Sequence, residues 1–72
     1  SMKDTPLPPK AVFIGEVGLS GELRPVSQME NRIKEAIKLG FEQIYVPENS
    51  KTKARKAVIK IKDLSAVYSL FS

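Results

Sequence analysis

The chain has 72 residues, of which 42% are hydrophobic, and its formal net charge is +4. That length allows one small domain or a piece of a larger one, and it excludes two folded domains. The sequence contains no Cys and no His, which excludes a disulfide framework, a thiolate zinc site, a cysteine nucleophile and histidine-based proton transfer. Any catalysis would depend on Lys, Ser and carboxylates.

The two ends of the sequence carry few signals. Met2 follows Ser1, and three prolines lie within the first nine residues. We therefore expect residues 1–10 to be a cloning scar followed by an extended tail. No apolar run approaches the ~18 residues of a membrane span, and the start lacks the apolar stretch of a signal peptide. These features predict a cytoplasmic protein with no membrane partner.

Positive charge is concentrated in residues 49–62, which contain six basic residues and no acidic one. The remaining six basic residues are outnumbered by eight acidic ones. A localised basic segment favours phosphate binding, because each Lys or Arg near a nucleic-acid backbone releases counterions. A solvated loop is the alternative, since no aromatic side chain lies among these charges to stack on bases. The six residues are Lys51, Lys53, Arg55, Lys56, Lys60 and Lys62.

The first half of the chain predicts a β-hairpin followed by a helix. Residues 11–19 are rich in β-branched and aromatic side chains, and a turn signal follows. Pro25 lacks a backbone donor, so the second strand, in residues 23–26, should end there or lie on an edge. Residues 27–30, Ser-Gln-Met-Glu, have the capping-box pattern that starts a helix, and Gly40 is the expected stop. Apolar residues lie between them at helical spacing: Met29, Ile33, Ala36 and Ile37.

The second half predicts two strands and a final helix. Residues 43–46 form a short strand closed by Pro47, and the strand-helix-strand order implies a parallel crossover. Residues 53–56 suggest a helical turn. Residues 57–62 alternate as a second strand, with Ile59 and Ile61 inward. In the last helix, which Asp63 can cap, an apolar stripe must cover a sheet or a partner: Leu64, Val67, Tyr68 and Phe71.

Residues 13–47 resemble the C-terminal Lon-protease-like domain of the bacterial RadA (Sms) family of DNA repair proteins. The most specific part is GEVGLSGELRPV, residues 15–26, followed by KLGF at the end of the helix and by the strand that ends at Pro47. The resemblance implies an α/β (α+β) fold of the ribosomal protein S5 domain 2-like type. Residues 11–72 would then be the C-terminal half of that domain, a β-hairpin followed by α-β-β-α.

The resemblance also implies a function for the parent family. Its members are cytoplasmic, ring-forming, DNA-dependent ATPases that promote branch migration in homologous recombination. Their zinc-binding cysteines and their sites for ATP and magnesium lie upstream of the Lon-like domain, and none of these motifs is in this sequence. We therefore expect no cofactor, no metal and no ATP hydrolysis in these 72 residues.

Lon proteases, a sister family, cut peptides with a Ser-Lys dyad. The nucleophilic Ser of that dyad belongs to a segment upstream of this sequence. The resemblance places the Lon lysine at Glu30, which the capping box already explains, so we expect no catalytic residue here.

Three hypotheses follow from the residues and the resemblance. The first is a non-catalytic module that helps a ring assemble and contacts DNA. The second is a pure oligomerisation scaffold without DNA contact, and the third is a peptidase remnant. Because half a domain leaves a sheet edge and a helix face uncovered, we also predict self-association, as a dimer. The DNA-binding candidates are Lys51, Lys53, Arg55, Lys56, Arg24 and Arg32.

Overall fold

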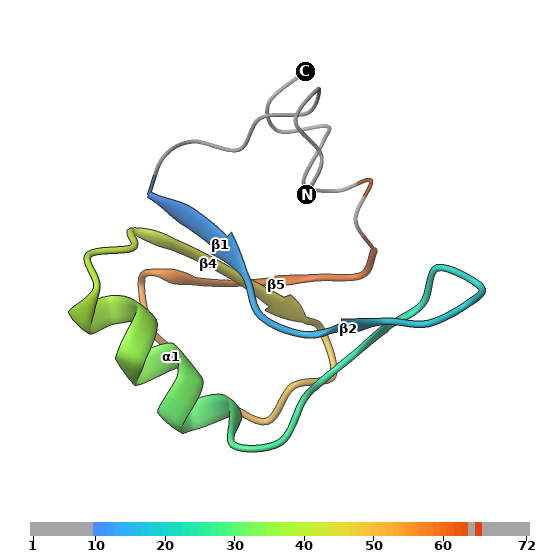
Figure 1. Cartoon of the computed structure of the whole chain (residues 1–72), viewed down its shortest axis with the longest axis horizontal. Helices are drawn as coiled ribbons and strands as arrows, with labels where there is room; N and C mark the ends of the chain where they lie inside the picture. Colours follow the sequence, from blue (N-terminus) through green and yellow to red (C-terminus); the bar gives the residue numbers. More distant parts are fainter. Residues whose placement is uncertain (1–9, 64, 66–72) are drawn as a thin grey trace.

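The computed structural model describes residues 10–63 and residue 65. Its centre is a three-stranded parallel sheet in the order β1-β4-β5 (Figure 1), formed by Ala11–Phe13, Gln43–Pro47 and Val58–Ile61. Ala11 pairs with Gln43 in one ladder, and Ile44 pairs with Val58 in the other. Strand β4 is central and its last four residues are buried, as expected for the apolar run that follows Gln43.

The predicted hairpin is confirmed only in its second part. β2 (Glu16–Val17) pairs antiparallel with β3 (Leu23–Arg24), which ends just before Pro25 as expected. The prediction was wrong for residues 11–13, which leave the hairpin and pair with β4 in the parallel sheet. The predicted parallel strand-helix-strand connection therefore runs from β1 to β4, with the hairpin and the helix lying between these two strands in the chain. The hairpin projects beyond the sheet as an arm (Figure 1).

Gly15 marks the point where the chain leaves the sheet for the hairpin. A Cβ atom at this position would lie 2.7 Å from Cζ of Phe13 and 2.9 Å from Cγ of Pro47. Pro47 is buried at the end of the central strand and cannot move aside. A residue without a side chain is therefore required where the two sheets separate.

Helix α1 spans Met29–Lys38 and ends as the sequence predicted. Gly40 has a φ of 96°, and the N–H groups of Gly40 and Phe41 donate to the carbonyls of Ile37 and Ala36. This pattern is the Schellman motif. The predicted capping box, however, is wrong: Gln28 is the N-cap, in the left-handed region, and it has no side-chain capping bond.

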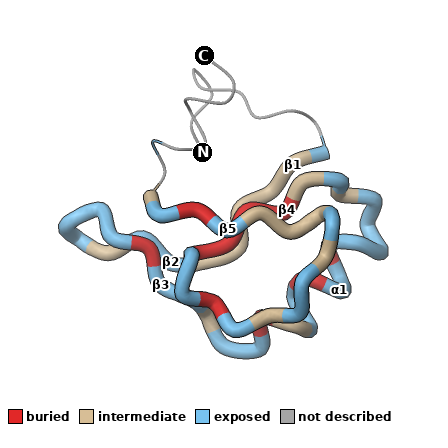
Figure 2. Tube along the Cα trace, turned by 180° about the vertical axis from the view of Figure 1, so that it is seen from behind, coloured by how far each residue is buried: buried red, intermediate tan, exposed pale blue. Residues whose placement is uncertain are grey.

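The apolar residues form two clusters, one on each face of the parallel sheet, and the alternation along each strand separates them. On one face α1 contributes Met29, Ile33 and Ala36, which pack with Ile44 and Val46 of β4. The other face holds Leu23 of the hairpin with Tyr45 and Ile61. Figure 2 shows these buried positions along the strands and on the inner side of α1. The inward placement of Ile59 and Ile61 is confirmed.

Strands β4 and β5 are joined by residues 48–57, which we call the crossover loop. Parallel neighbours are usually connected by a helix, but here the connection is irregular and ends in a turn at Lys56 and Ala57. The predicted helical turn at residues 53–56 is therefore wrong. At the start of the loop the Ser50 N–H donates to the Pro47 carbonyl, and at its end the Val58 N–H donates to the Arg55 carbonyl.

The predicted last helix, with its apolar stripe, lies outside the described residues apart from Ser65. The Ser65 hydroxyl donates to the Asp63 carboxylate. Of the expected tail, residues 1–10, only Lys10 is described, and its carbonyl accepts the N–H groups of Glu42 and Gln43. No helix in the described part of the chain is long and apolar enough to cross a membrane.

Candidate nucleic-acid interface

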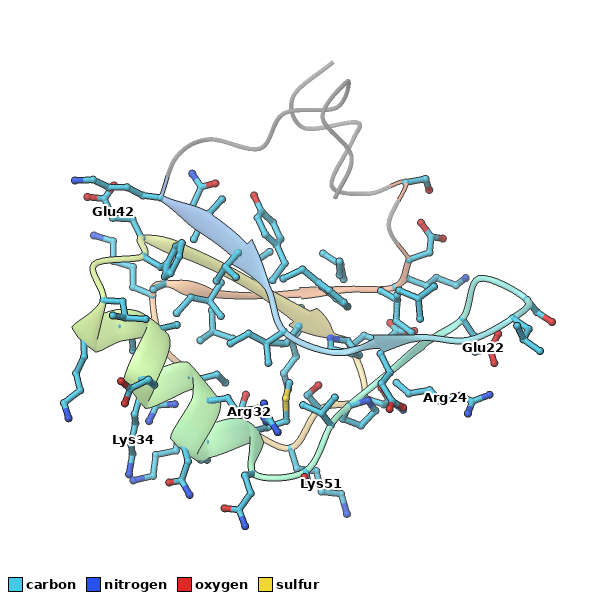
Figure 3. The ribbon with its side chains drawn as sticks, in the orientation of Figure 1. Glu22, Arg24, Arg32, Lys34, Glu42 and Lys51 are labelled. Carbon is cyan, nitrogen blue, oxygen red and sulfur yellow. The ribbon has the colours of Figure 1, made fainter. Side chains whose placement is uncertain are left out.

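The crossover loop presents the basic side chains that the sequence singled out. Lys51, Lys53 and Lys56 are exposed, whereas Arg55 is half-buried. Figure 3 shows Lys51 beside the start of α1, at the opposite end of the helix from Glu42. The structure thus places three exposed lysines on one segment, and the backbone of one of them, Lys53, contacts Glu30 in the first turn of α1.

Glu30, in that first turn, binds the middle of the crossover loop. Its Oε1 accepts a hydrogen bond from Nη2 of Arg55 at 2.7 Å, and its Oε2 accepts one from Nη1 at 3.2 Å. Oε2 also accepts the backbone N–H of Lys53 at 2.7 Å. The arrangement is a bidentate, charge-assisted pair reinforced by a backbone donor. It explains why Glu30 does not turn back to cap its own helix.

These contacts change the proton affinity of Glu30. The hydrogen bonds from Arg55, and then from the Lys53 backbone, lower the pKa of Glu30 from 4.5 to about 2. The same pair raises the pKa of Arg55. At neutral pH the two groups are therefore fully charged, and their charges offset one another. Arg55 carries less free positive charge toward a ligand than its three lysine neighbours.

The lowered pKa of Glu30 predicts a loss of stability in acid. A carboxyl with a depressed folded-state pKa stabilises the fold above its unfolded value, and this contribution disappears as pH falls from about 4.5 toward about 2. We expect the free energy of unfolding, measured by denaturant titration, to fall through that window. Glu30→Gln should show a flatter pH profile, and a slope identical to that of the unaltered chain would contradict the assignment.

A depression of about 220 Å³ lies between the crossover loop and β5. It is lined by Thr52, Lys53 and Arg55 from the loop and by Val58 and Lys60 from the strand, together with Ala54. Lys60 and Lys53 thus line the same depression, which sequence reasoning did not predict. The sequence did indicate that Lys60 points away from Ile59 and Ile61, because side chains alternate between the two faces of a strand, and Lys60 belongs to the basic segment.

The other two candidates lie on different elements. Arg24 is on the hairpin and donates from Nη2 to Oε2 of Glu22 at 2.6 Å, a pair that lowers the pKa of Glu22. Arg32 is on α1, and its Nε donates to the Ser27 carbonyl at 2.9 Å. Figure 3 shows Arg24, Arg32 and Lys51 on three separate elements. The structure therefore does not gather all six candidates into one patch.

An apolar groove of about 420 Å³ lies between β1 and α1. Val12 and Phe13 form its strand side, Ala36 and Leu39 form its helix side, and Phe41 adds to the lining. Arg32 and Glu35 provide its charged lining. In the sheet order β1 is an edge strand, so the groove runs along one border of the described sheet.

Among the described residues, no group of three or more acidic side chains could hold a metal ion.

Comparison with known proteins identifies the family. The sequence model of the family described as "Subunit ChlI of Mg-chelatase" matches residues 1–50. The DNA repair protein RadA of Streptococcus pneumoniae is 58% identical over 52 residues, which cover 72% of this chain. The chain belongs to the ChlI family and is homologous to part of bacterial RadA. The resemblance inferred from GEVGLSGELRPV is thereby confirmed.

Other RadA proteins match in the same way. RadA of Bacillus subtilis is 57% identical over 47 residues, and RadA of a Synechocystis species is 42% identical over 69 residues, or 96% of this chain. The chain spans only 12%, 10% and 14% of the length of the three RadA relatives. The ChlI match ends at Ser50 and so includes the hairpin, α1 and β4. The lysines of the crossover loop follow that boundary.

Proposed function

We propose that this RadA-homologous fragment is a non-catalytic module that contacts DNA phosphates through the crossover loop and contributes to assembly of its parent protein. The observation that carries the proposal is the placement of Lys51, Lys53 and Lys56, exposed on one segment that is fixed at Glu30. Phosphate contacts of this kind supply affinity without sequence preference. The RadA relatives, which are DNA repair proteins by name, support a nucleic-acid ligand.

The wider context is part of the same proposal. We place residues 11–72 in the C-terminal half of a Lon-like domain, inside a parent protein that acts as a DNA-dependent ATPase in recombination. ATP, magnesium and zinc would bind elsewhere in that parent. A peptidase remnant is the weaker reading, because the position of the Lon lysine holds Glu30, whose carboxylate is already engaged by Arg55.

The proposal is tested by measuring binding of the 72-residue chain to fluorescent single-stranded and duplex DNA. Salt is varied between about 50 and about 200 mM, where phosphate-mediated affinity falls steeply. We expect salt-dependent binding with little dependence on DNA sequence. Absence of binding at the lowest salt, by a chain whose circular dichroism shows folded structure, would reject DNA contact.

A scaffold without DNA contact is the second candidate, and the apolar groove beside the β1 edge favours it. Exposed apolar side chains add to the argument, since Leu39 on the helix side of the groove is exposed and Leu19 at the hairpin turn is fully exposed. Light scattering in the same DNA experiment separates the two candidates. An oligomer that does not bind DNA would favour the scaffold, and a DNA-binding monomer would reject it.

A further inference from the structure

We propose that Glu30 is the positioning residue of the DNA interface: its carboxylate holds the crossover loop in the conformation in which the lysines reach phosphates. This inference rests on the proposed function and assigns a role within it. Glu30 lies 23 residues before Lys53 and 25 before Arg55, so the contact joins two parts of the chain that are distant in sequence.

The geometry shows how much of the loop depends on this one side chain. The backbone–backbone hydrogen bonds of the loop lie toward its two ends: the N–H groups of Glu48 and Ser50 donate at one end, and the carbonyls of Arg55 and Ala57 accept at the other. Between those ends, the Lys53 amide donates to Glu30. Lys51 and Lys56 flank this anchored stretch on either side. Without the carboxylate, residues 51–55 would lose the amide contact and the bidentate contact together.

The positioning role of Glu30 can be tested because it predicts the opposite change in DNA affinity from a simple charge argument. Glu30 is an acid beside a basic segment, and a simple charge argument says that it should weaken binding of a phosphate backbone. Removing its charge would then strengthen DNA binding. A positioning role predicts the opposite, because lysines on an unanchored loop lose conformational freedom when they bind, and that cost lowers affinity.

The experiment compares Glu30→Gln with Glu35→Gln in the same DNA titration. Both changes remove one negative charge from α1, and Glu35 is an exposed residue of that helix outside the loop contacts. We expect Glu30→Gln to bind DNA roughly tenfold more weakly. The salt slope, which is the steepness with which log affinity falls as log salt concentration rises, should be smaller by about one, the value of one phosphate contact. Glu35→Gln should bind as tightly as the unaltered chain or slightly more tightly.

A second variant tests the geometry without a change of charge. Arg55→Lys keeps the cation but loses the bidentate pair, so we expect weaker binding and a smaller salt slope here too. Hydrogen exchange at the Lys53 amide should be faster in both variants, while amides of the β4 ladder keep their protection. The exchange rate of the Lys53 amide shows whether Glu30 holds the loop when no DNA is bound.

The outcomes separate this inference from the proposed function. If the unaltered chain does not bind DNA, the proposed function fails, and the positioning role fails with it. If the unaltered chain binds DNA but Glu30→Gln binds equally well or more tightly, the interface stands and the positioning role alone is overturned. Unchanged exchange at Lys53 in Glu30→Gln would also overturn it.

Discussion

Replacement of Lys51, Lys53 and Lys56 by Ala together is expected to lower DNA affinity on the order of a hundredfold at about 0.1 M salt and to reduce the salt slope by about three. The physical reason is counterion release, since each lysine that neutralises a phosphate contributes about 0.9 to the slope. The three side chains are exposed, so their removal should leave the free energy of unfolding nearly unchanged. Fluorescence anisotropy across the salt range measures both effects.

The matched control replaces three other exposed lysines, Lys10, Lys34 and Lys38, by Ala. It changes the net charge by the same amount but removes charges from the start of β1 and from α1, outside the crossover loop. If DNA binding depended on net charge alone, both triple variants would weaken it equally. That result would remove the crossover loop from the interface.

A core substitution should have the largest effect on stability. Ile33 is on the inner face of α1, has 0% of its surface exposed, and packs with Ile44 and Val46. Ile33→Ala should lower the free energy of unfolding by about 2–5 kcal/mol, from lost apolar transfer and the cavity that remains. For a domain this small, whose total stability is marginal, that loss unfolds a large share of the molecules. Denaturant or thermal unfolding measures it.

Ile37→Ala is the matched control for Ile33→Ala. Ile37 is in the same helix, but 42% of its surface is exposed, so the same chemical change leaves no closed cavity. Its loss of stability should be well below that of Ile33→Ala. Equal losses would mean that the inner face of α1 is not packed as described.

Local signals in the sequence predicted most of the elements. The spacing of Met29, Ile33 and Ala36 located the helix and its buried face, Gly40 its end, and Pro47 the end of β4. The partner of a strand is not a local property, which is why residues 11–13 were assigned to the hairpin although they pair with β4. Apolar alternation fixes the face of a strand but not its neighbour.

The candidate site shows the same limit. The basic segment identified the exposed lysines, but the partner of Glu30 could not be read from the residues beside it. Its pattern with Ser27 matched a capping box, whereas a guanidinium 25 residues away forms the stronger, charge-assisted contact. Arg55 was therefore expected to be as free as its neighbours, and it is instead engaged within the molecule.

The parallel pairing of β1 with β4 has a consequence for the order in which the chain folds. The paired residues Ala11 and Gln43 are separated by the whole of the hairpin and α1, so closing this loop costs entropy before any ladder bond forms. Among the strands of the described residues, only β2 and β3 pair through a short turn. We therefore expect the hairpin arm and α1 to form first. During synthesis on the ribosome, β1 would stay without its partner until residues 43–47 have emerged.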